Sequence, residues 1–573
     1  MDKKSILAIV IITIIILLLP AYYRLVYNEP TASPLPRTEL EKFIPDTLIA
    51  KSENLPAPEF KESGETFKEE IATSITGNII DSSTEEKFIE IETPLIRAKI
   101  SNKGGGKIYN YFLKNYQNWD QSAVTLINES LQNGLDINFL SAQGIKVQLD
   151  QYNFFTEDEY QAKKVLRSED SFFRSYYVYY NEIKLEKRIT FYGNRYHVNI
   201  QFIVSRPEGI FLNNEYQLSW LNGLPSNEEN KVEDYSYSEI YTSMGDELES
   251  FSIASEGEAK EKSLSGLSAW TAIRTKYFLA AIIPINVKTA SVTFGGRGVS
   301  INEIIERQYN ASLNIIKSKD TKIDSFMVYM GPLDQTILSD YKIGLNKLVL
   351  SHGWYERTFR VISLPIVSLL KFIYLFVPNY GVVIIIFSIL IKILVYPLTK
   401  KSYRSMKEMS KLQPLLLELK EKYKGDPQRY QKETMKLYKE HGVNPMGGCL
   451  PILLQLPLLA ALFTVFRSTI QLRGASFIPG WIDDLSRADT IFTLPFSLPF
   501  YGNQFNVLPI LMTVSMIIQS KMTMKDPKQK AMIYIMPIFM LFLFNQFPSG
   551  LNLYYTLFNI WTILQQKFID NRG

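Results

Sequence analysis

Lys392 is the residue whose surroundings point most directly to chemistry, because it interrupts an apolar run long enough to cross a membrane. The run extends from Tyr380 to Leu398 and is otherwise almost wholly apolar. A lysine at this depth costs roughly 3 kcal/mol on translocon-type scales, so it faces protein or water rather than lipid. Two interpretations are open: a cation in a hydrated cavity, or a side chain that snorkels to the cytoplasmic edge near Lys400.

Polar side chains recur in the other apolar runs of the C-terminal part. Each of them alone could form an interhelical hydrogen bond worth under about 2 kcal/mol. They are Gln455, Thr513, Ser515, Gln519, Asn545, Gln546, Asn552, Asn559 and Gln565. Together with Lys392 they favour the first interpretation, a hydrated cavity inside a helical bundle.

The composition argues against several classes of chemistry. The single cysteine, Cys449, excludes a disulfide framework and a Cys-based metal cluster, and the three histidines are too scattered to suggest a zinc site. No Walker sequence, nucleophile motif or carboxylate pair with convincing spacing occurs. We therefore expect no metal, no cofactor, no DNA partner and no catalysed covalent reaction.

Residues 358–570 alternate long apolar runs with short charged loops, a pattern typical of a membrane-embedded bundle. Several runs are shorter than the ~20 residues that a 30 Å core needs, which predicts a locally thinned bilayer. The five candidate spans are Tyr380–Leu398, Pro445–Phe466, Val507–Met522, Ala531–Phe547 and Leu551–Phe568. A sixth run, Ser5–Tyr23, fits a signal peptide or an uncleaved anchor, and its aromatic flank favours an anchor.

The charge of one connecting segment orients these spans. Residues 399–441 carry twelve Lys and Arg against six Asp and Glu, a net charge of +6, which places this short segment in the cytoplasm. The ambiguous run Val361–Val377 would reverse that orientation if it crossed, so we interpret it as an amphipathic helix in the membrane interface. Six spans with both chain ends in the cytoplasm follow.

The same basic segment has the pattern of a helical hairpin. Apolar residues recur every three or four positions on both sides of Gly425, while Asp426 and Pro427 provide a helix cap and a first helical position. The basic side chains could contact phospholipid head groups or ribosomal RNA, or could form a solvated surface that obeys the positive-inside rule. They include Lys400, Lys401, Arg404, Lys407, Lys411 and Arg429.

A large polar region separates the first run from the bundle. Residues 28–86 are rich in Pro, Glu, Ser and Thr and predict a flexible tether. From Phe88 onward apolar and polar residues alternate, Gly104–Gly106 predict a turn, and two alternating runs around Gly193 predict a hairpin. Many such strands predict an antiparallel β-sandwich. Its tyrosines could form a sugar-binding or peptide-binding face, but packing within the strands is the favoured interpretation.

Three motifs give the C-terminal part a more specific signature. They are Tyr396–Thr399; Asn444–Cys449 with Pro451, Gln455 and Pro457; and Phe547–Leu551 with Tyr554 and Tyr555. Together they closely resemble the core motifs of the YidC membrane protein insertases, which are related to the mitochondrial Oxa and chloroplast Alb insertases. The resemblance extends over the whole chain, and it implies a groove in the inner leaflet that is open to cytoplasm and lipid and closed to the periplasm.

The resemblance also implies roles for individual residues. The groove cation is Lys392, where the family most often has arginine, so the charge is retained but the bidentate guanidinium is lost. The polar lining then includes Gln455, Gln519 and Asn559. The surface along which incoming chains slide would draw on Cys449, Pro451, Pro457, Met536, Met540 and Phe544.

We therefore expect a multi-domain membrane protein of the bacterial inner membrane, with six transmembrane helices and a periplasmic antiparallel β-sandwich. It would insert and fold nascent membrane proteins, alone or with the Sec translocon, in contact with lipids and a translating ribosome. The alternative is an anion transporter or channel, which predicts internal repeats that the spans do not show. The expected parts are an anchor (1–27), a tether (28–86), the sandwich with a C-terminal helical stretch (87–350), the interfacial helix (351–379) and a five-helix core (380–570) containing the hairpin (400–441).

Overall fold

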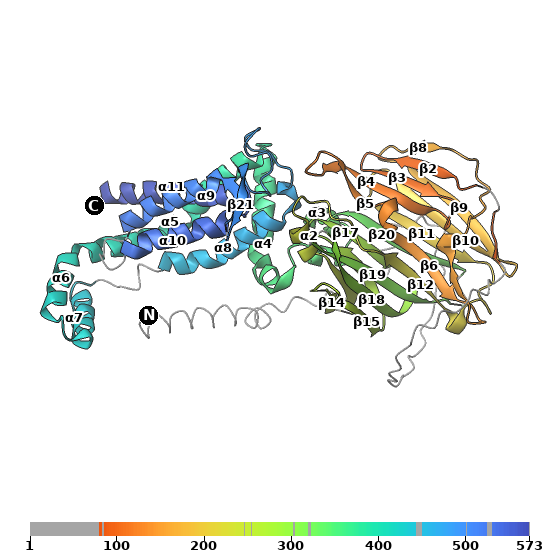
Figure 1. Cartoon of the computed structure of the whole chain (residues 1–573), viewed down its shortest axis with the longest axis horizontal. Helices are drawn as coiled ribbons and strands as arrows, with labels where there is room; N and C mark the ends of the chain where they lie inside the picture. The colour runs from red at the N-terminus through yellow and green to blue at the C-terminus, as the bar shows by residue number, and fades with distance from the viewer. Residues whose placement is uncertain are drawn as a thin grey trace. The chain divides into compact units, whose positions relative to one another are not determined.

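The computed structural model describes residues 79–571, with gaps at 83–84, 246, 254, 302–303, 319–321, 443–449, 500 and 524–529. The expected anchor and nearly all of the expected tether lie outside the described residues. The chain divides into two compact units, Met1–Pro332 and Leu333–Gly573. The first is made mainly of strands and the second mainly of helices (Figure 1). The helical stretch that follows Pro332 belongs to the second unit.

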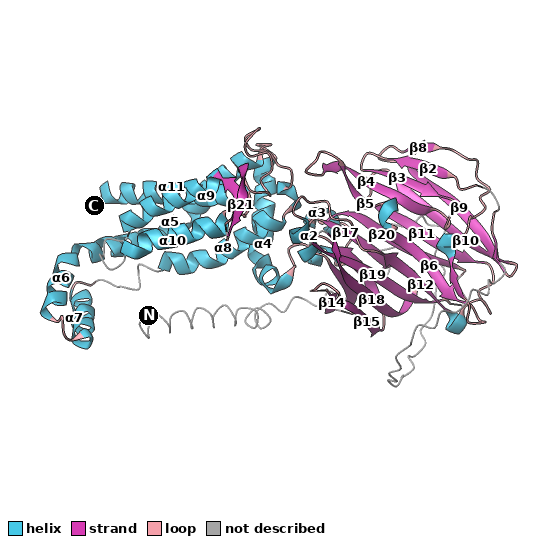
Figure 2. Ribbon diagram, viewed as in Figure 1, coloured by secondary structure: helices cyan, strands magenta, loops and turns pink. Residues whose placement is uncertain are grey.

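Three sheets form the first unit (Figure 2). The nine-stranded sheet has the order β1 (Ile79–Ile80), β9 (Ser171–Tyr180), β10 (Ile183–Tyr192), β11 (His197–Val204), β20 (Ile323–Pro332), β17 (Phe278–Pro284), β16 (Ser268–Arg274), β13 (Glu239–Met244) and β14 (Glu247–Phe251). The six-stranded sheet has the order β15 (Ala259–Ser265), β18 (Lys288–Ile301), β19 (Ile304–Ile316), β12 (Glu215–Leu221), β6 (Gly134–Leu140) and β7 (Lys146–Gln148). The five-stranded sheet has the order β5 (Ala123–Ile127), β4 (Lys107–Gln117), β3 (Ile96–Ser101), β2 (Phe88–Glu92) and β8 (Lys163–Val165).

The strands of this unit follow the two-residue period of the sequence. Side chains along β10 and β11 alternate between buried and partly exposed positions, and the two strands pair antiparallel across Gly193, which confirms the predicted hairpin. The predicted turn at Gly104–Gly106 is also confirmed, because all three glycines have positive φ. Among the described strands, neighbours pair antiparallel, except that β2 and β8 are parallel.

The nine-stranded and six-stranded sheets enclose an apolar and aromatic core. The ring of Phe202 on β11 contacts that of Tyr216 on β12, with the ring planes tilted and the centroids 5.1 Å apart. On β9, Tyr176 and Tyr180 are buried, while Tyr177 is partly exposed and stacks on a neighbouring ring. Packing, the favoured interpretation of the tyrosines, therefore describes this strand. One short helix, α2 (Lys231–Ser236), and the 3-10 turns η2 (Glu129–Leu131), η3 (Leu149–Gln151) and η4 (Leu212–Asn214) connect the strands.

The second unit is a helical bundle with a small two-stranded sheet, β21 (Thr490–Leu498) and β22 (Gly502–Asn506). One described helix contains a segment long and apolar enough to cross a membrane, Tyr380–Pro397, with a mean hydropathy of 2.3. Three shorter apolar helices lie at Leu456–Ser468, Val507–Met522 and Ile533–Phe544. The elements are α3 (Gln335–Ser339), η5 (Leu345–Leu348), α4 (Gly353–Tyr374), α5 (Tyr380–Lys411), α6 (Gln413–Lys422), α7 (Pro427–Glu440), α8 (Leu450–Ser468), η7 (Ile470–Leu472), α9 (Val507–Thr523), α10 (Lys530–Phe544) and α11 (Ser549–Asn571).

Helix α4 packs against α8 through buried polar contacts. The Ser363 hydroxyl donates to the Ala461 carbonyl at 3.2 Å, and the Ser468 hydroxyl donates to the Glu356 carboxylate at 2.6 Å. The outer face of α4 exposes large apolar side chains, including Trp354 and Phe372. Helix α4 is not among the described helices that are apolar enough to span.

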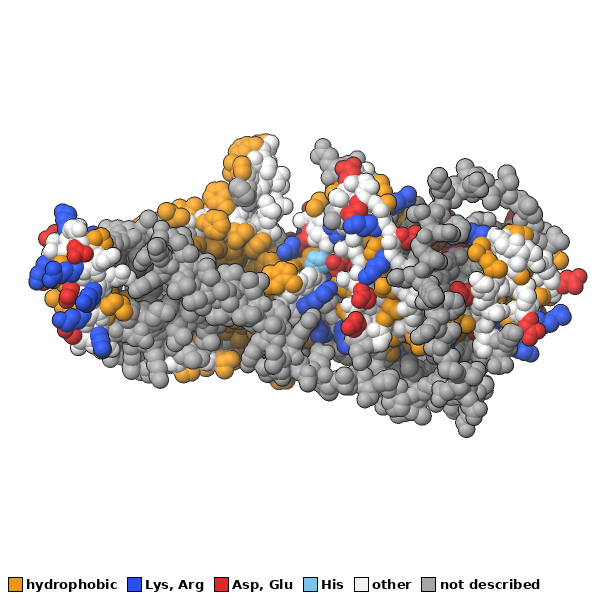
Figure 3. All heavy atoms as spheres, turned by 90° about the horizontal axis from the view of Figure 1, so that it is seen from below, with side chains coloured by type: hydrophobic (Ala, Val, Ile, Leu, Met, Phe, Trp, Pro, Cys, Tyr) orange, Lys and Arg blue, Asp and Glu red, His pale blue; other side chains and the backbone are white. Residues whose placement is uncertain are grey.

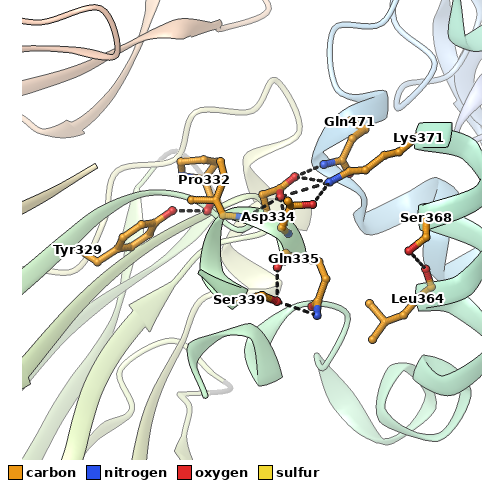
Figure 4. Close-up of polar contacts among 11 residues, drawn as sticks. Tyr329, Pro332, Asp334, Gln335, Ser339, Leu364, Ser368, Lys371 and Gln471 are labelled. Atoms are coloured by element: carbon orange, nitrogen blue, oxygen red, sulfur yellow. Dashed lines mark hydrogen bonds and ion pairs between the residues drawn. The ribbon is translucent and has the colours of Figure 1, made fainter. Parts of the chain in front are cut away.

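The Asp334 side chain makes polar contacts with several segments at the start of the helical unit (Figure 4). Its carboxylate caps α3 by accepting from the Thr336 backbone N–H at 2.7 Å, and it lies 2.9 Å from the Lys371 ammonium in the last turn of α4. The Gln471 side-chain amide, which follows α8, donates to the same carboxylate. One buried side chain therefore joins three segments that are distant in sequence.

Helices α6 and α7 form a helical hairpin, whereas residues 400–411, which the prediction placed in its first helix, continue α5. Asp426 caps α7 by accepting from the Arg429 backbone N–H at 3.0 Å, and Pro427 is the first residue of that helix, so both parts of the prediction are confirmed. Neither helix buries any of its described residues. Charged side chains of both signs intermix over this end of the unit, whereas the visible described surface of the bundle is largely hydrophobic (Figure 3).

Candidate functional site

Lys392 lies on α5 and turns its side chain toward α11. It is 9% exposed, and its ammonium donates to the Thr562 hydroxyl at 2.7 Å. The same ammonium lies 4.3 Å from the centroid of the Phe558 ring, within the range of a cation–π interaction. The described contacts of the Lys392 ammonium therefore lie on α11.

The charge of Lys392 lacks a counterion within the described part of the chain. Its contacts there are one hydroxyl and one aromatic ring, and neither carries a negative charge. A buried charge normally needs an ionic partner to offset the loss of hydration. Among the described side chains, none therefore offsets the charge of this buried ammonium.

Helix α11 carries a row of buried polar side chains beside this cation. The Asn559 amide donates to the Ser515 hydroxyl of α9 at 3.1 Å, and the Trp561 indole N–H donates to the Ser388 hydroxyl of α5 at 3.0 Å. Gln565 and Gln566, about one turn beyond Thr562, are also buried. The polar row thus lies between α5 and α9.

The other end of the bundle is filled by aromatic rings. The Tyr554 ring lies 5.9 Å from that of Phe387 on α5 and 6.1 Å from that of Phe466 on α8. Phe547 lies between α8 and α10, 5.2 Å from Phe463 and 4.9 Å from Phe544. We call these six residues the aromatic plug.

The direction of the helices shows which end is filled. Phe387 of α5 lies beside Tyr554 of α11, and Lys392 lies beside Thr562, so the contacts advance together and the two helices run parallel. The basic hairpin follows the C-terminal end of α5. The polar row is therefore nearer to the basic hairpin, and the aromatic plug is farther from it.

Comparisons with known proteins match both units. The family described as "60Kd inner membrane protein" matches residues 372–573, and the family described as "YidC periplasmic domain" matches residues 88–369. The membrane protein insertase YidC of Pelodictyon phaeoclathratiforme is 34% identical over 581 residues, covering 100% of this chain and 95% of its own. The protein of the same name from Prosthecochloris aestuarii is 33% identical over 580 residues, with the same coverages.

This chain belongs to the YidC membrane protein insertase family. Residues 88–369 correspond to the periplasmic domain of the family, and residues 372–573 correspond to its inner-membrane part. A crystal structure described as an active YidC insertase with the first transmembrane domain resolved is 19% identical, with a TM-score of 0.35, over 85% of this chain and 93% of that chain. The assignment rests on the family models and the sequence relatives.

The structure brings two of the residues assigned from the YidC resemblance into one polar region. Asn559 lies about one turn before Thr562, the residue that contacts Lys392, and its own amide donates to Ser515 of α9. Gln519 lies about one turn after Ser515 on α9 and is half-buried. The side chain of Gln455 lies outside the described part of the chain.

The residues assigned to the substrate slide are placed on separate helices. Pro457 is half-buried on α8, a helix that packs against α4, α5 and α11. Met536 is 42% exposed and Met540 is half-buried on α10, which packs against α9. Phe544 is buried in the aromatic plug. Cys449 and the side chain of Pro451 lie outside the described residues.

Two of the basic residues assigned to the hairpin have described side chains. Lys411 is exposed and pairs with Glu408 at 2.8 Å, and the Arg429 guanidinium lies 5.4 Å from the Tyr423 ring centroid. A surface pair of this kind contributes at most about 1 kcal/mol. The side chains of the other four, Lys400, Lys401, Arg404 and Lys407, lie outside the part of the chain that the structure describes.

Thr562 and Phe558, the two residues that contact the cation, were not predicted from the sequence. A threonine in an apolar helix usually bonds the carbonyl four residues earlier, and Thr562 does so, donating to the Phe558 carbonyl at 2.7 Å. A signal was nevertheless present. Asn559, Thr562 and Gln566 are spaced by three and four residues, which places them on one face of a helix.

Proposed function

We propose that this chain inserts nascent membrane proteins, and that Lys392 receives the polar end of the incoming chain in a groove bounded by α5, α9 and α11. The observation that carries the proposal is the buried ammonium without a described carboxylate partner. Thr562 and Phe558 hold the ammonium but do not neutralise it. An acidic or strongly polar segment entering from the cytoplasm would find a fixed positive charge partway into the bilayer.

The two ends of the bundle support a one-sided groove. The aromatic plug closes the end away from the basic hairpin, so a polar segment would not pass directly to the other side. The polar row on α11 offers hydroxyl and amide groups at the end nearer to the hairpin. Groups of this kind replace part of the hydration that the segment loses on entry.

The driving force in this proposal is burial of the incoming chain's own apolar helix. Apolar surface contributes about 25 cal/mol per Å² when it leaves water, so a spanning helix has enough free energy to offset the transfer of a short polar tail. The protein lowers the barrier for that tail. Met536 and Met540, with Pro457 on α8, would contact the apolar helix as it moves into lipid, because flexible methionines adapt to varied apolar partners.

The proposal includes the full topology expected from the sequence. Six spans would place both chain ends and the α6–α7 hairpin in the cytoplasm and the sandwich in the periplasm, with α4 in the interface. The exposed basic hairpin would meet lipid head groups or a translating ribosome, and the Sec translocon would be a partner for some substrates.

The test is insertion of a purified substrate with an acidic tail into liposomes that contain the full-length protein. Lys392→Arg should retain activity, while Lys392→Met and Lys392→Glu should lower it about tenfold or more, because a charge-assisted hydrogen bond contributes about 1.5 kcal/mol or more. The matched control is the same substrate with Asn in place of each Asp of its tail. Equal activity of the Glu and Arg variants on the acidic substrate would refute an electrostatic role.

An anion transporter or channel also explains an unpaired cation. It predicts anion flux through liposomes in the absence of any substrate protein, and loss of that flux in Lys392→Met. The aromatic plug favours the insertase, since it fills the path that a small anion would need.

A further inference from the structure

The β21–β22 hairpin of the helical unit exposes apolar side chains on a segment without charge. No Lys, Arg, Asp or Glu occurs between Asp489 and Lys521. The exposed fractions are 56% for Ile491, 50% for Phe492, 57% for Phe496 and 40% for Leu498. In water, such a cluster would be an aggregation hazard.

The β21–β22 hairpin also has features that would make it unstable in water. Its sheet has two strands, and a two-stranded sheet by itself is marginally stable in water. Thr493 pairs with Gln504 and Leu498 with Gly502, so residues 494–497 have no partner in the ladder among the described residues of the hairpin. Phe496 lies at the centre of this unpaired stretch.

The base of the hairpin is nevertheless held firmly. Asp489 accepts from the backbone N–H groups of Val507 and Leu508 at 2.9 and 2.7 Å, which caps the start of α9. Asn545, just after α10, donates to the Tyr501 and Gln504 carbonyls at 2.9 and 2.8 Å. The hairpin is therefore a fixed projection at the end of α9 and α10, opposite the end that leads to the basic hairpin.

The helices at this base also expose apolar side chains. Leu511 and Val514 on α9, and Ile538 and Phe539 on α10, are all exposed. The uncharged surface of the hairpin continues this surface of the bundle. An apolar face that continues the lipid-facing sides of membrane helices is more stable in contact with lipid than in contact with water.

We propose that the β21–β22 hairpin is a lipid anchor that lies in the interface of the bilayer leaflet opposite the α6–α7 hairpin, with Phe496 in contact with phospholipid acyl chains. The unpaired backbone at residues 494–497 excludes the hydrocarbon centre, where no water satisfies its polar groups, but is tolerated at the interface. Phenylalanine and leucine are also the apolar residues with which interfacial segments enter the boundary of head groups and acyl chains. The lack of charge makes the contact independent of head-group charge.

The experiment replaces single residues with photoreactive p-benzoylphenylalanine in the full-length protein, reconstituted in vesicles of phosphatidylethanolamine and phosphatidylglycerol. After irradiation, mass spectrometry identifies what is attached. Phe496 and Ile491 should gain a phospholipid, as should the positive control Ile535, an exposed residue of α10. Leu267, which is equally apolar and exposed but lies in a sandwich turn, should gain none.

The yield at Phe496 should stay within about twofold when phosphatidylglycerol is omitted or salt is raised, because no charge attracts the head groups. Attachment of Phe496 to a second copy of the chain, or no attachment while Ile535 still gains lipid, would overturn the proposal. Attachment at Ile535 shows that the vesicles and the irradiation allow lipid labelling, and protection of the helical unit from protease in each variant shows that it is folded and inserted. Failure of the proposed insertase activity would leave this result unaffected, because no substrate is present.

Discussion

Lys317 in the sandwich and Lys392 in the helical unit are both buried, yet Lys317 has an ionic partner and Lys392 has none among the described residues. The Lys317 ammonium lies 2.8 Å from the Asp324 carboxylate, with side chains 1% and 2% exposed, and Tyr216 donates to the same carboxylate at 2.8 Å. Lys392 has a hydroxyl and a ring.

The difference separates a structural charge from one that is available for binding. A buried pair that is fully hydrogen-bonded makes each partner necessary to the other, so loss of one leaves an uncompensated charge. A buried cation without a counterion already has that cost in the folded protein. Its removal should therefore change the stability of the fold little, because the desolvation cost and the contacts of the ammonium are lost together.

Replacement of each lysine by methionine gives the sharpest test of this comparison. Lys317→Met should destabilise the sandwich by about 3–5 kcal/mol, because Asp324 remains buried without its partner. Lys392→Met should change the stability of the helical unit by less than about 1 kcal/mol, because an unpaired charge is lost. Hydrogen exchange of β20 and α5 peptides in the full-length protein measures both. Equal destabilisation of the two units would contradict the distinction between a paired and an unpaired buried lysine.

A titration extends the comparison to a third buried group, His197 of β11. Burial, with a smaller contribution from Arg195, lowers the pKa of His197 to about 3. Because the folded pKa lies below the unfolded value of 6.5, the unfolded chain binds more protons between these values. Sandwich stability should therefore fall by a few kcal/mol as the pH drops from 6.5 toward 3.

Hydrogen exchange of β11 peptides at several pH values measures this loss. The His197→Phe protein is the matched control, since it keeps an aromatic ring of similar size without a titrating group. Its β11 peptides should lose less protection over the same pH range. An identical loss in both proteins would assign the pH dependence to other groups of the sandwich.

The hydroxyl beside Lys392 offers a smaller and more local change. Thr562→Val keeps the shape of the side chain but removes the acceptor of the ammonium hydrogen bond, which contributes about 1–3 kcal/mol. Insertion of a substrate with an acidic tail should fall several-fold, while Thr562→Ser retains activity. If the Val and Ser proteins insert equally well, Thr562 does not position Lys392.

The smallest expected effect concerns the helical hairpin of α6 and α7. Asp426→Ala removes the cap of α7 and should cost about 1 kcal/mol in local helix stability. Because neither α6 nor α7 buries a described residue, the loss of stability should stay within α7. Hydrogen exchange should become faster in the first turn of α7 and stay unchanged in α5. Asp426→Asn should retain most of the cap. Spread of the loss into α5 would show that the hairpin is coupled to the bundle.

Local sequence patterns predicted individual strands and helix ends, because these elements depend mainly on residues that are neighbours in the chain. Alternation around Gly193 predicted β10 and β11, and Asp426 with Pro427 predicted the start of α7. The same reasoning missed Phe558 and Thr562, since their role depends on α5 lying beside α11. Spacing along one helix shows which side chains share a face, but it does not show which helix meets that face.

The sequence by itself determined that a lysine lies inside a long apolar helix, that a β-rich region precedes it and that the chain carries the family's motifs, because composition, period and motif are written along the chain. The tertiary structure decided that Lys392 meets Thr562 and Phe558 on a helix about 170 residues away and that aromatic rings fill the opposite end of the bundle. Packing between distant segments decides whether a buried charge is paired, and that packing depends on the whole fold.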